Sequence, residues 1–376
     1  MKEQHYQLRG LDPLLFRDGR AFGTDPLQRG ARTLPVPAPP TIAGLIRSRL
    51  GSVSGWDWAG DGPDLAMKTE VHGPILLRDG TPIFAAPADA VVPRDGGTVM
   101  PLRPTAKPGT WCNLPAGLLP LSVTADAKPA TDFAFWKQTD MFTWLLNASG
   151  DKSTLPERIP PLPQEIRIHV SIDPVTGKAA DSRLFSTSSL VFESEATRNS
   201  DAVKFHTYYF AVRVKHAASA DLRGPALMGG ERRVGVIEHQ ADLENSFWKT
   251  PDEIVRALKG SKYIRMVLAT PAVFTNGWKP GWLGDDNSGF VPGVDGVQLK
   301  LVAAAVPRKL AISGWDLKAK RSKPVRWMAP AGAVYFFELL EGDGADLTTG
   351  AWLQPVSDDV QDRRDGCGLA LWGLWA

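Results

Sequence analysis

Histidine, the side chain that most often performs acid–base chemistry near neutral pH, occurs six times in this chain, at scattered positions. The histidines are His5, His72, His169, His206, His216 and His239. Their spacing does not match that of metal ligands, so a structural or surface role is the favoured interpretation for each. His206 and His216 flank one expected strand, and a metal-independent nuclease could use such residues as acid and base. This pair is the only catalytic candidate that the sequence offers.

Other catalytic patterns are missing from the sequence. No glycine-rich loop ends in Lys-Ser or Lys-Thr, as in nucleoside triphosphatases, and no Gly-x-Ser-x-Gly turn suggests a serine hydrolase. The two cysteines, Cys112 and Cys367, have no metal-binding or disulfide-framework spacing, which fits a reducing cytoplasm. Asp285 and Asp286 lie in a glycine-rich stretch that favours a turn over a metal site. We therefore predict no catalytic residues, no metal and no cofactor.

The clearest binding feature is a glycine turn with two arginines, Gly229-Gly230-Glu231-Arg232-Arg233, followed by a short apolar run. Adjacent glycines allow positive φ angles and a close approach of the backbone to another surface. Arg232 and Arg233 can each form two hydrogen bonds with a phosphate. In isolation such a turn is also typical of an ordinary surface hairpin, so its place in the chain decides between the two interpretations.

A second binding feature combines tryptophans with cations. Within residues 314–327, Trp315 and Trp327 are interleaved with the cations Lys318, Lys320, Arg321, Lys323 and Arg326. Single-stranded nucleic acid is bound in this way, because cations neutralise phosphates and aromatic faces stack on bases. Several phosphate contacts would also make the affinity fall steeply with salt. The alternative is a basic hairpin whose two tryptophans belong to the core.

A third feature is the uneven distribution of charge. The net charge is only +2, yet residues 1–50 and 300–326 are basic and residues 338–365 are acidic. The cations of the first region that follow its expected strand include Arg17, Arg20 and Arg32. This pattern favours one face for a polyanion and another for protein partners. Any single patch can also be ordinary solvated surface.

The elements that must position these residues belong to a soluble globular chain. Its 376 residues include 43% hydrophobic and 22% charged side chains, enough for two ordinary domains or one large one. The 36 glycines and 31 prolines favour long loops and short strands over a helical bundle. The sequence has neither a secretion signal nor an apolar run long enough to cross a bilayer, so we expect a cytoplasmic location and no membrane association.

In the first part of the chain, apolar periodicity and turn residues predict strands, two helices and long loops. The expected segments are a strand over residues 5–16, a helix from Thr41 to Gly51, a hairpin of residues 74–78 and 82–92 around Asp79-Gly80, an irregular stretch over 93–129, a helix over 140–149, and strands over 165–172, 183–192 and 205–214. On the first helix, Ile42, Ile46 and Leu50 belong to one apolar stripe, and Arg47 lies off it.

The second half begins after a well-marked helix. The segment Thr250-Pro251-Asp252-Glu253 has an N-cap, a proline at the first position and a capping-box glutamate. This helix should end before Gly260, and we place the domain boundary between residues 258 and 259. Beyond it, strands are expected over residues 263–277, 297–306 and 331–340, and glycines at 366–373 lead into a last apolar strand.

The two halves share a pattern that suggests an internal duplication. Residues 6–19 and 263–277 both read as an apolar strand with a proline past its middle, followed by Phe-x-(Asp/Asn)-Gly. Each half also ends with close glycines that enter an apolar strand. The sequence therefore predicts an α+β protein with two related domains, residues 1–258 with insertions and residues 259–376.

Taken together, these motifs resemble the RAMP superfamily of CRISPR-associated proteins, and within it the third subunit of the Cmr, or type III-B, effector complex. The motifs that carry the resemblance are Phe16-Arg17-Asp18-Gly19-Arg20-Ala21-Phe22, Leu34-Pro35-x-Pro37, Gly229-Gly230-Glu231-Arg232-Arg233-x-Gly235, Thr270-Pro271-Ala272-x-Phe274, Gly314-Trp315-Asp316, Lys323-Pro324-x-Arg326 and Pro330-Ala331-Gly332-x-Val334-Tyr335-Phe336. They extend from about residue 6 to the end of the chain and are specific in combination rather than singly. One departure is Ala21, where the family pattern leads us to expect proline.

The resemblance implies two ferredoxin-like domains, of the RRM or RAMP type, with antiparallel sheets, glycine-rich loops and long insertions. It also implies a non-catalytic subunit that holds the 5′ repeat-derived tag of the crRNA, between the large polymerase-like subunit and the backbone subunit of an antiviral ribonucleoprotein. By position, the arginines of the loop from Arg17 to Arg32, which we call the first loop, and those of the glycine turn would contact the tag. Residues 314–327 would make a secondary contact with RNA or a subunit. The candidate RNA-binding residues are Arg17, Arg20, Arg32, Gly229, Gly230, Arg232, Arg233, Trp315, Lys318, Lys320, Arg321, Lys323 and Arg326.

Two other functions stay open. RAMP relatives that process RNA use a histidine early in the chain, and the nearest one here, His5, lies inside the expected first strand, which argues against cleavage. A metal-independent endoribonuclease that cuts CRISPR repeat RNA with His206 or His5 is nevertheless the alternative function. A protein-interaction scaffold is the third, and it predicts no salt-sensitive RNA binding.

Overall fold

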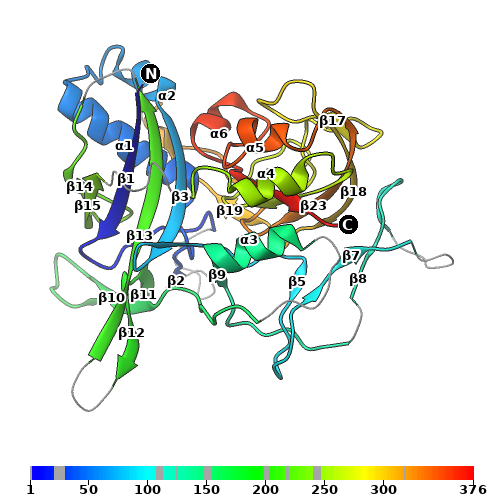
Figure 1. The fold of residues 1–376 in the computed structure, drawn as a ribbon. Helices are drawn as coiled ribbons and strands as arrows, with labels where there is room; N and C mark the ends of the chain where they lie inside the picture. Colours follow the sequence, from blue (N-terminus) through cyan, green and yellow to red (C-terminus); the bar gives the residue numbers. More distant parts are fainter. Residues whose placement is uncertain are drawn as a thin grey trace.

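The computed structural model describes residues 2–20, 30–106, 113–123, 126–147, 155–198, 203–216, 220–239, 247–316 and 319–376. They form an α+β protein with two large antiparallel sheets, which make the left and right lobes of Figure 1. None of the helices in this part of the chain is long and apolar enough to cross a membrane.

The first sheet has eight strands. Their order is β14 (Gly224–Leu227), β15 (Val234–His239), β1 (Lys2–Gly10), β13 (Val203–His216), β3 (Glu70–Arg78), β4 (Thr81–Ala85) and β9 (Phe135–Lys137), with β12 (Glu193–Arg198) paired to the first part of β13. The hairpin predicted around Asp79-Gly80 is confirmed, and both of its turn residues have positive φ. β1 is shorter than predicted, because the chain turns at Gly10 and Leu14 then pairs with Leu190 instead.

The second sheet repeats the central strand order of the first. Its strands are β17 (Ser288–Phe290), β18 (Gln298–Ala305), β23 (Val334–Glu341), β16 (Tyr263–Leu268) and β24 (Ala370–Leu374), in that order. In the first sheet, β1 lies between β13 and the closing strand β15, and β3 lies on the other side of β13. In the second sheet, β16 lies between β23 and the closing strand β24, and β18 lies on the other side of β23. The closing strands β15 and β24 each follow a glycine-containing turn, as the two-half pattern in the sequence predicts.

Helix α1 (Pro39–Ser54) covers β3 with its apolar stripe. Ile42, Ile46 and Leu50 are fully buried, as predicted. The predicted ends of this helix were wrong. Two prolines with fixed φ start the helix ahead of Thr41, and it continues past Gly51 to a left-handed cap at Gly55. A second short helix, α2 (Gly62–Lys68), forms in the following segment.

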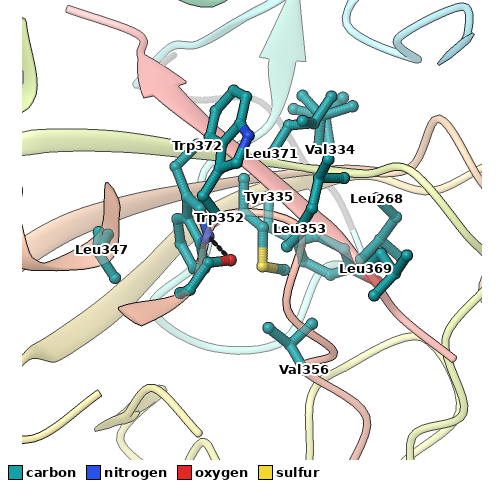
Figure 2. Close-up of a cluster of buried hydrophobic side chains, with 14 of the residues drawn as sticks. Leu268, Val334, Tyr335, Leu347, Trp352, Leu353, Val356, Leu369, Leu371 and Trp372 are labelled. Carbon is teal, nitrogen blue, oxygen red and sulfur yellow. Dashed lines mark hydrogen bonds between the residues drawn. The ribbon is translucent and has the colours of Figure 1, made fainter. Parts of the chain in front are cut away.

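The largest core is shared by the two halves of the chain. It combines Ile75, Leu77 and Phe84 of the first sheet with buried residues of every long strand of the second sheet. Helices α3 (Gln138–Leu146) and α4 (Asp252–Leu258) both pack on β24. Figure 2 shows the centre of this core, where Trp352 and Trp372 lie against aliphatic side chains. The indole nitrogens of both tryptophans donate hydrogen bonds to backbone carbonyl oxygens at 3.0 Å.

α4 begins one residue later than its capping motif indicated. Pro251 occupies the N-cap position, and the Thr250 hydroxyl instead donates a hydrogen bond to the backbone carbonyl of Thr348. This hydrogen bond fixes the start of α4 to the second half of the chain.

The irregular stretch predicted after β4 is confirmed to have little regular structure, and we refer to it below as the insertion. It contains only two-residue strands among the described residues, β5 (Ala90–Val91), β6 (Met100–Pro101), β7 (Arg103–Pro104) and β8 (Leu121–Ser122). A buried ion pair joins it to the second sheet, because the Asp89 carboxylate lies 2.7 Å from Nη1 of Arg265 on β16. Neither side chain of this pair is exposed to solvent.

A third sheet extends from the first lobe. It consists of β10 (Gln164–Ile172), β11 (Ala179–Leu190) and β2 (Gly30–Ala31). Alternate residues of β10 face solvent with aliphatic side chains, and Ile166 and Ile168 are 70% and 72% exposed. A sheet face of this composition is normally covered in soluble proteins.

The remaining elements belong to the second half. The hairpin β19 (Leu310–Ile312) and β22 (Arg326–Met328) carries a smaller pair, β20 (Trp315–Asp316) and β21 (Arg321–Ser322). Two short helices, α5 (Asp346–Gly350) and α6 (Val360–Arg364), lie between β23 and β24. We refer to residues 309–328 as the Trp hairpin.

Candidate RNA-binding site

The glycine turn joins β14 to β15 and lies directly against the first loop. The amide of Gly230 donates a hydrogen bond to the Leu15 carbonyl oxygen at 2.8 Å. Gly229 has φ of 75°, and a Cβ at this position would lie 2.7 Å from the same oxygen. This close approach requires glycine. The backbone contact brings together two arginine-bearing segments that are more than two hundred residues apart in the sequence.

The first loop is a pair of short extended segments with exposed arginines. The Asp18 amide donates to the Arg32 carbonyl oxygen at 3.1 Å, which sets Arg32 beside Arg17. Arg17, Arg20 and Arg32 are all exposed. Arg20 pairs with the Asp18 carboxylate at 3.1 Å, and Arg17 donates a hydrogen bond to the Arg20 carbonyl oxygen. The segment around Ala21 lies outside the described residues.

A glycine also fixes the first loop to the second half. The Gly19 amide donates to the Ala311 carbonyl oxygen at 2.9 Å, and a Cβ at Gly19 would lie 3.0 Å from that oxygen. The Trp hairpin, which contains Ala311, therefore packs beside the first loop. The sequence contained the Arg-Asp-Gly turn, but nothing in it indicated the partner of the glycine.

The two arginines of the glycine turn differ in their surroundings. Arg233 pairs with the Glu231 carboxylate at 3.0 Å. Arg232 is exposed, and its φ of 53° places it in the left-handed region together with Glu231. Arg232 is thus the more accessible of the two for a phosphate.

A groove runs along the first half of α1 from the glycine turn to the Trp hairpin. It begins as a cavity of about 460 Å³ between Leu15–Arg17, Gly229, Gly230 and the exposed face of α1. A cavity of about 530 Å³ follows, and the two share Thr41, Gly44, Ile312 and Ser313. Gly44 of α1 lines both cavities, and the space beside it is open, because nothing lies within 4 Å of where its Cβ would be. We call the combined feature the α1 groove.

The charge of the α1 groove changes along its length. The end at the glycine turn carries the arginines described above, whereas the walls near the Trp hairpin are lined by Asp316, Asp359, Asp362 and Asp365 together with two cations. One of these cations, Arg326, pairs with Asp362, with Nη1 and Oδ2 3.1 Å apart. The hydrogen bond with Asp362 raises the pKa of Arg326. A phosphate at Arg326 would have to displace this carboxylate.

The tryptophans of the Trp hairpin are on the surface. Trp315 is 60% exposed and Trp327 is 49% exposed, which excludes the alternative that both belong to the core. Trp315 and Lys323 line the α1 groove, while Trp327 faces a different cavity. Lys320 and Arg321 are exposed at the tip of the hairpin, and Lys318 lies outside the described residues.

One further arginine behaves differently from the sequence expectation. Arg47 of α1, which lies off the apolar stripe, is buried and pairs with Asp365 at 2.6 Å. It also donates a hydrogen bond to the Thr69 carbonyl oxygen at 2.7 Å. This arginine joins α1 to α6 across one wall of the groove, so its role is structural.

The histidines do not form an acid–base pair. His206 and His216 lie near opposite ends of β13, roughly 30 Å apart at the usual rise of a strand. His206 Nδ1 lies 2.6 Å from the Asp79 carboxylate, and His216 is buried with Nε2 2.8 Å from Gln4 Oε1. His5 is buried in β1 beside Trp248. Among the described residues, no three His, Cys, Asp or Glu side chains gather as metal ligands would.

Comparison with known families decides the identity of the chain. A family model described as CRISPR-associated protein (Cas_Cmr3) matches residues 6–375. The chain belongs to the Cmr3 family. It is therefore a type III-B CRISPR effector subunit of the RAMP kind. No curated protein sequence matches this Cmr3-family chain.

Two solved structures resemble this Cmr3-family chain. One is a chain of the type III-B Cmr-beta complex bound to cognate target RNA and AMPPnP, with 15% identity and a TM-score of 0.45. The other is a chain of the same complex bound to cognate target RNA, with 17% identity and a TM-score of 0.48. In both comparisons the match covers 89% of this chain and 86% of the other.

Proposed function

We propose that this chain is a non-catalytic, RNA-binding subunit that holds the 5′ tag of the crRNA at the glycine turn and the first loop. The observation that carries the proposal is the hydrogen bond from Gly230 to Leu15, which gathers the arginines of both segments at one end of the α1 groove. Cations on exposed backbone turns bind phosphates without requiring a particular base. Arg232 and Arg17 are the residues that we expect to contact the tag most directly.

The architecture supports two ferredoxin-like domains, residues 1–258 with insertions and residues 259–376. The strand order β15-β1-β13-β3 and its counterpart β24-β16-β23-β18 are those of a ferredoxin-like sheet. Each half has a helical connection at only one crossover among the described residues, α1 with α2 in the first and α5 with α6 in the second. We attribute the difference to the insertions that replace the other helices.

The proposal includes protein partners. We place this chain between the large polymerase-like subunit and the backbone subunit of the complex, in a soluble cytoplasmic assembly. The acidic residues near the Trp hairpin, Asp359 and Asp316, suit a basic protein surface better than RNA. The arginine-bearing end of the groove and its acidic end would then serve RNA and protein respectively.

The site is tested by a charge-removing double variant, Arg232→Ala with Arg233→Ala, assayed against guide RNA with and without its tag. We expect weaker binding of the tagged guide and a slope of log affinity against log salt reduced by about 2. The control is Arg158→Ala with Arg223→Ala, which removes the same charge from exposed arginines elsewhere. Unchanged tag affinity and normal assembly in the first double variant would remove the site assignment.

Absence of catalysis is tested separately. The purified chain is incubated with labelled CRISPR repeat RNA, and we expect no site-specific cleavage. Cleavage that is lost in His206→Ala would instead establish the endoribonuclease alternative, in which His206, with Nδ1 beside the Asp79 carboxylate, would act as the acid or base.

A further inference from the structure

The cavity that Trp327 faces is separate from the α1 groove. Its volume is about 700 Å³, within the usual range for ligand pockets, and it shares no lining residue with the groove. One wall is the insertion segment from Leu114 to Leu121, and the other consists of second-half residues that include Trp278 and Val306. We call it the Trp327 pocket.

Hydrogen bonds fix both walls of the Trp327 pocket. The Leu119 amide donates to the Val302 carbonyl oxygen at 2.8 Å, which attaches the insertion to β18. On the insertion side, Asn287 Nδ2 donates a hydrogen bond to the Ala116 carbonyl oxygen at 3.2 Å. On the opposite wall, the Tyr335 hydroxyl donates a hydrogen bond to the Trp278 carbonyl oxygen at 2.7 Å. The pocket is therefore formed before any ligand arrives, so a ligand would not have to order it.

The charge of the Trp327 pocket is the opposite of that found in the acidic part of the groove. Lys309 lines it, Arg308 is exposed beside it, and none of the described lining residues is acidic. The rest of the lining is apolar or aromatic. An occupant with an aromatic body and an anionic group matches this arrangement.

We propose that the Trp327 pocket takes one unpaired nucleotide of an RNA strand, with its base on the Trp327 face and its phosphate at Lys309 and Arg308. Lys309 Nζ now lies 4.0 Å from the centroid of the Trp327 ring, and it is exposed. Base stacking on an aromatic side chain is stronger than an exposed cation–π contact. A base therefore displaces the ammonium group from the ring, and the freed Lys309 meets the phosphate.

This inference rests on the proposed RNA-binding function and extends it to a second place on the chain. The strands β19 and β22 form a wall of both sites, because Ile312 lines the arginine-bearing cavity of the groove while Trp327 and Met328 line the pocket. Paired strands are only about 5 Å apart, so one RNA strand can cross the hairpin and contact both sites.

The test compares base-containing RNA with RNA that lacks bases. Binding of an octauridylate and of an abasic octamer is measured by fluorescence anisotropy for the wild type, Trp327→Ala, Trp327→Phe, and the control Phe290→Ala, which removes an exposed aromatic ring of β17 that lines neither site. We expect Trp327→Ala to weaken octauridylate binding on the order of 10-fold, and Trp327→Phe to retain most of the affinity. The abasic octamer should bind the wild type and Trp327→Ala equally. Since Trp327 is half exposed, thermal unfolding should be unchanged in both variants.

The results separate this inference from the proposed function. If Trp327→Ala binds octauridylate like the wild type while the Arg232→Ala, Arg233→Ala variant binds it weakly, the pocket proposal is wrong and the proposed function stands. If the wild type binds neither octamer nor guide RNA, both fail. Loss of complex assembly in Trp327→Ala with unchanged RNA affinity would assign the pocket to a protein partner instead.

The source of the nucleotide is identified in the assembled complex. A 4-thiouridine is placed in the guide strand or in the target strand, and the crosslinked peptide is mapped after irradiation. A crosslink to the β22 peptide from either strand supports the pocket and names the strand. Crosslinks from both strands that map only elsewhere on the chain would overturn it.

Discussion

The buried carboxylate of Asp89 offers the sharpest test of what holds the two halves together. It accepts hydrogen bonds from Nη1 of Arg265 at 2.7 Å and from the indole nitrogen of Trp144 at 2.9 Å. Arg103 lies 3.7 Å away. Burial, together with the charge of Arg265, lowers the pKa of Arg103 to about 10. Two guanidinium groups thus share one carboxylate that has no contact with solvent.

We predict that Asp89→Asn destabilises the protein strongly although it changes the shape of the side chain very little. The amide oxygen of asparagine can still accept from Trp144, but the amide nitrogen then replaces the oxygen that accepts from Arg265, so the charge and this hydrogen bond are lost together. Leaving the fully buried Arg265 without its counterion costs about 3–5 kcal/mol. At about 2–4 °C per kcal/mol, the midpoint of thermal unfolding should fall by roughly 6 °C or more.

The assay is thermal and urea unfolding of Asp89→Asn beside Asp95→Asn, an exposed aspartate of the same insertion. The control should stay within about 0.5 kcal/mol of the wild type. A double variant, Asp89→Leu with Arg265→Met, should be more stable than Asp89→Asn, because apolar replacement of both partners removes the unpaired charge. Our reasoning is refuted if Asp89→Asn unfolds like the control, or if the double variant is the least stable of the set.

Three smaller changes test other features. Gly229→Ala should weaken tag binding and lower stability more than Gly80→Ala. Both glycines have positive φ, but only the Cβ added at Gly229 would lie 2.7 Å from a carbonyl oxygen. Guide-RNA titration and urea unfolding measure the difference. Ile168→Ser should change the free energy of unfolding by no more than about 0.5 kcal/mol, since the side chain is 72% exposed already. For Asp79, burial raises the pKa, but hydrogen bonds from the Thr207 amide and from His206 outweigh it and lower the pKa overall. The small stability that this carboxylate contributes should therefore be present above about pH 4 and lost as the pH falls further, and Asp79→Asn should lack that part of the pH dependence in acid unfolding.

Local features of the fold could be predicted from the sequence because local chemistry determines them. The Asp79-Gly80 hairpin forms where two turn residues interrupt alternating apolar residues, and α3 forms where a dense apolar segment has helical spacing. The repeated order of strands in the two sheets agrees with the repeated motif at residues 6–19 and 263–277. The family itself came from the motifs in combination, since no single one of them is specific.

Features that depend on distant partners could not be predicted. Arg47 is buried because Asp365 meets it from 318 residues away. The position of the glycine turn against Leu15 and the position of Gly19 against Ala311 are set by tertiary packing, which leaves no periodic signal in the sequence.

The shared core also bears on how the chain matures during translation. α3 is synthesised early, yet the surface that covers it includes β24 (Ala370–Leu374), the closing strand of the second sheet. Until the ribosome has released residue 374, Leu145 and Met141 of α3 lack their permanent neighbours on β24, whereas Asp89 can pair with Arg265 as soon as β16 has been made. The nascent first half therefore presents an unfinished apolar surface for most of its synthesis. Nascent-chain proteolysis should show α3 becoming resistant late and in a single step, when the closing strand docks.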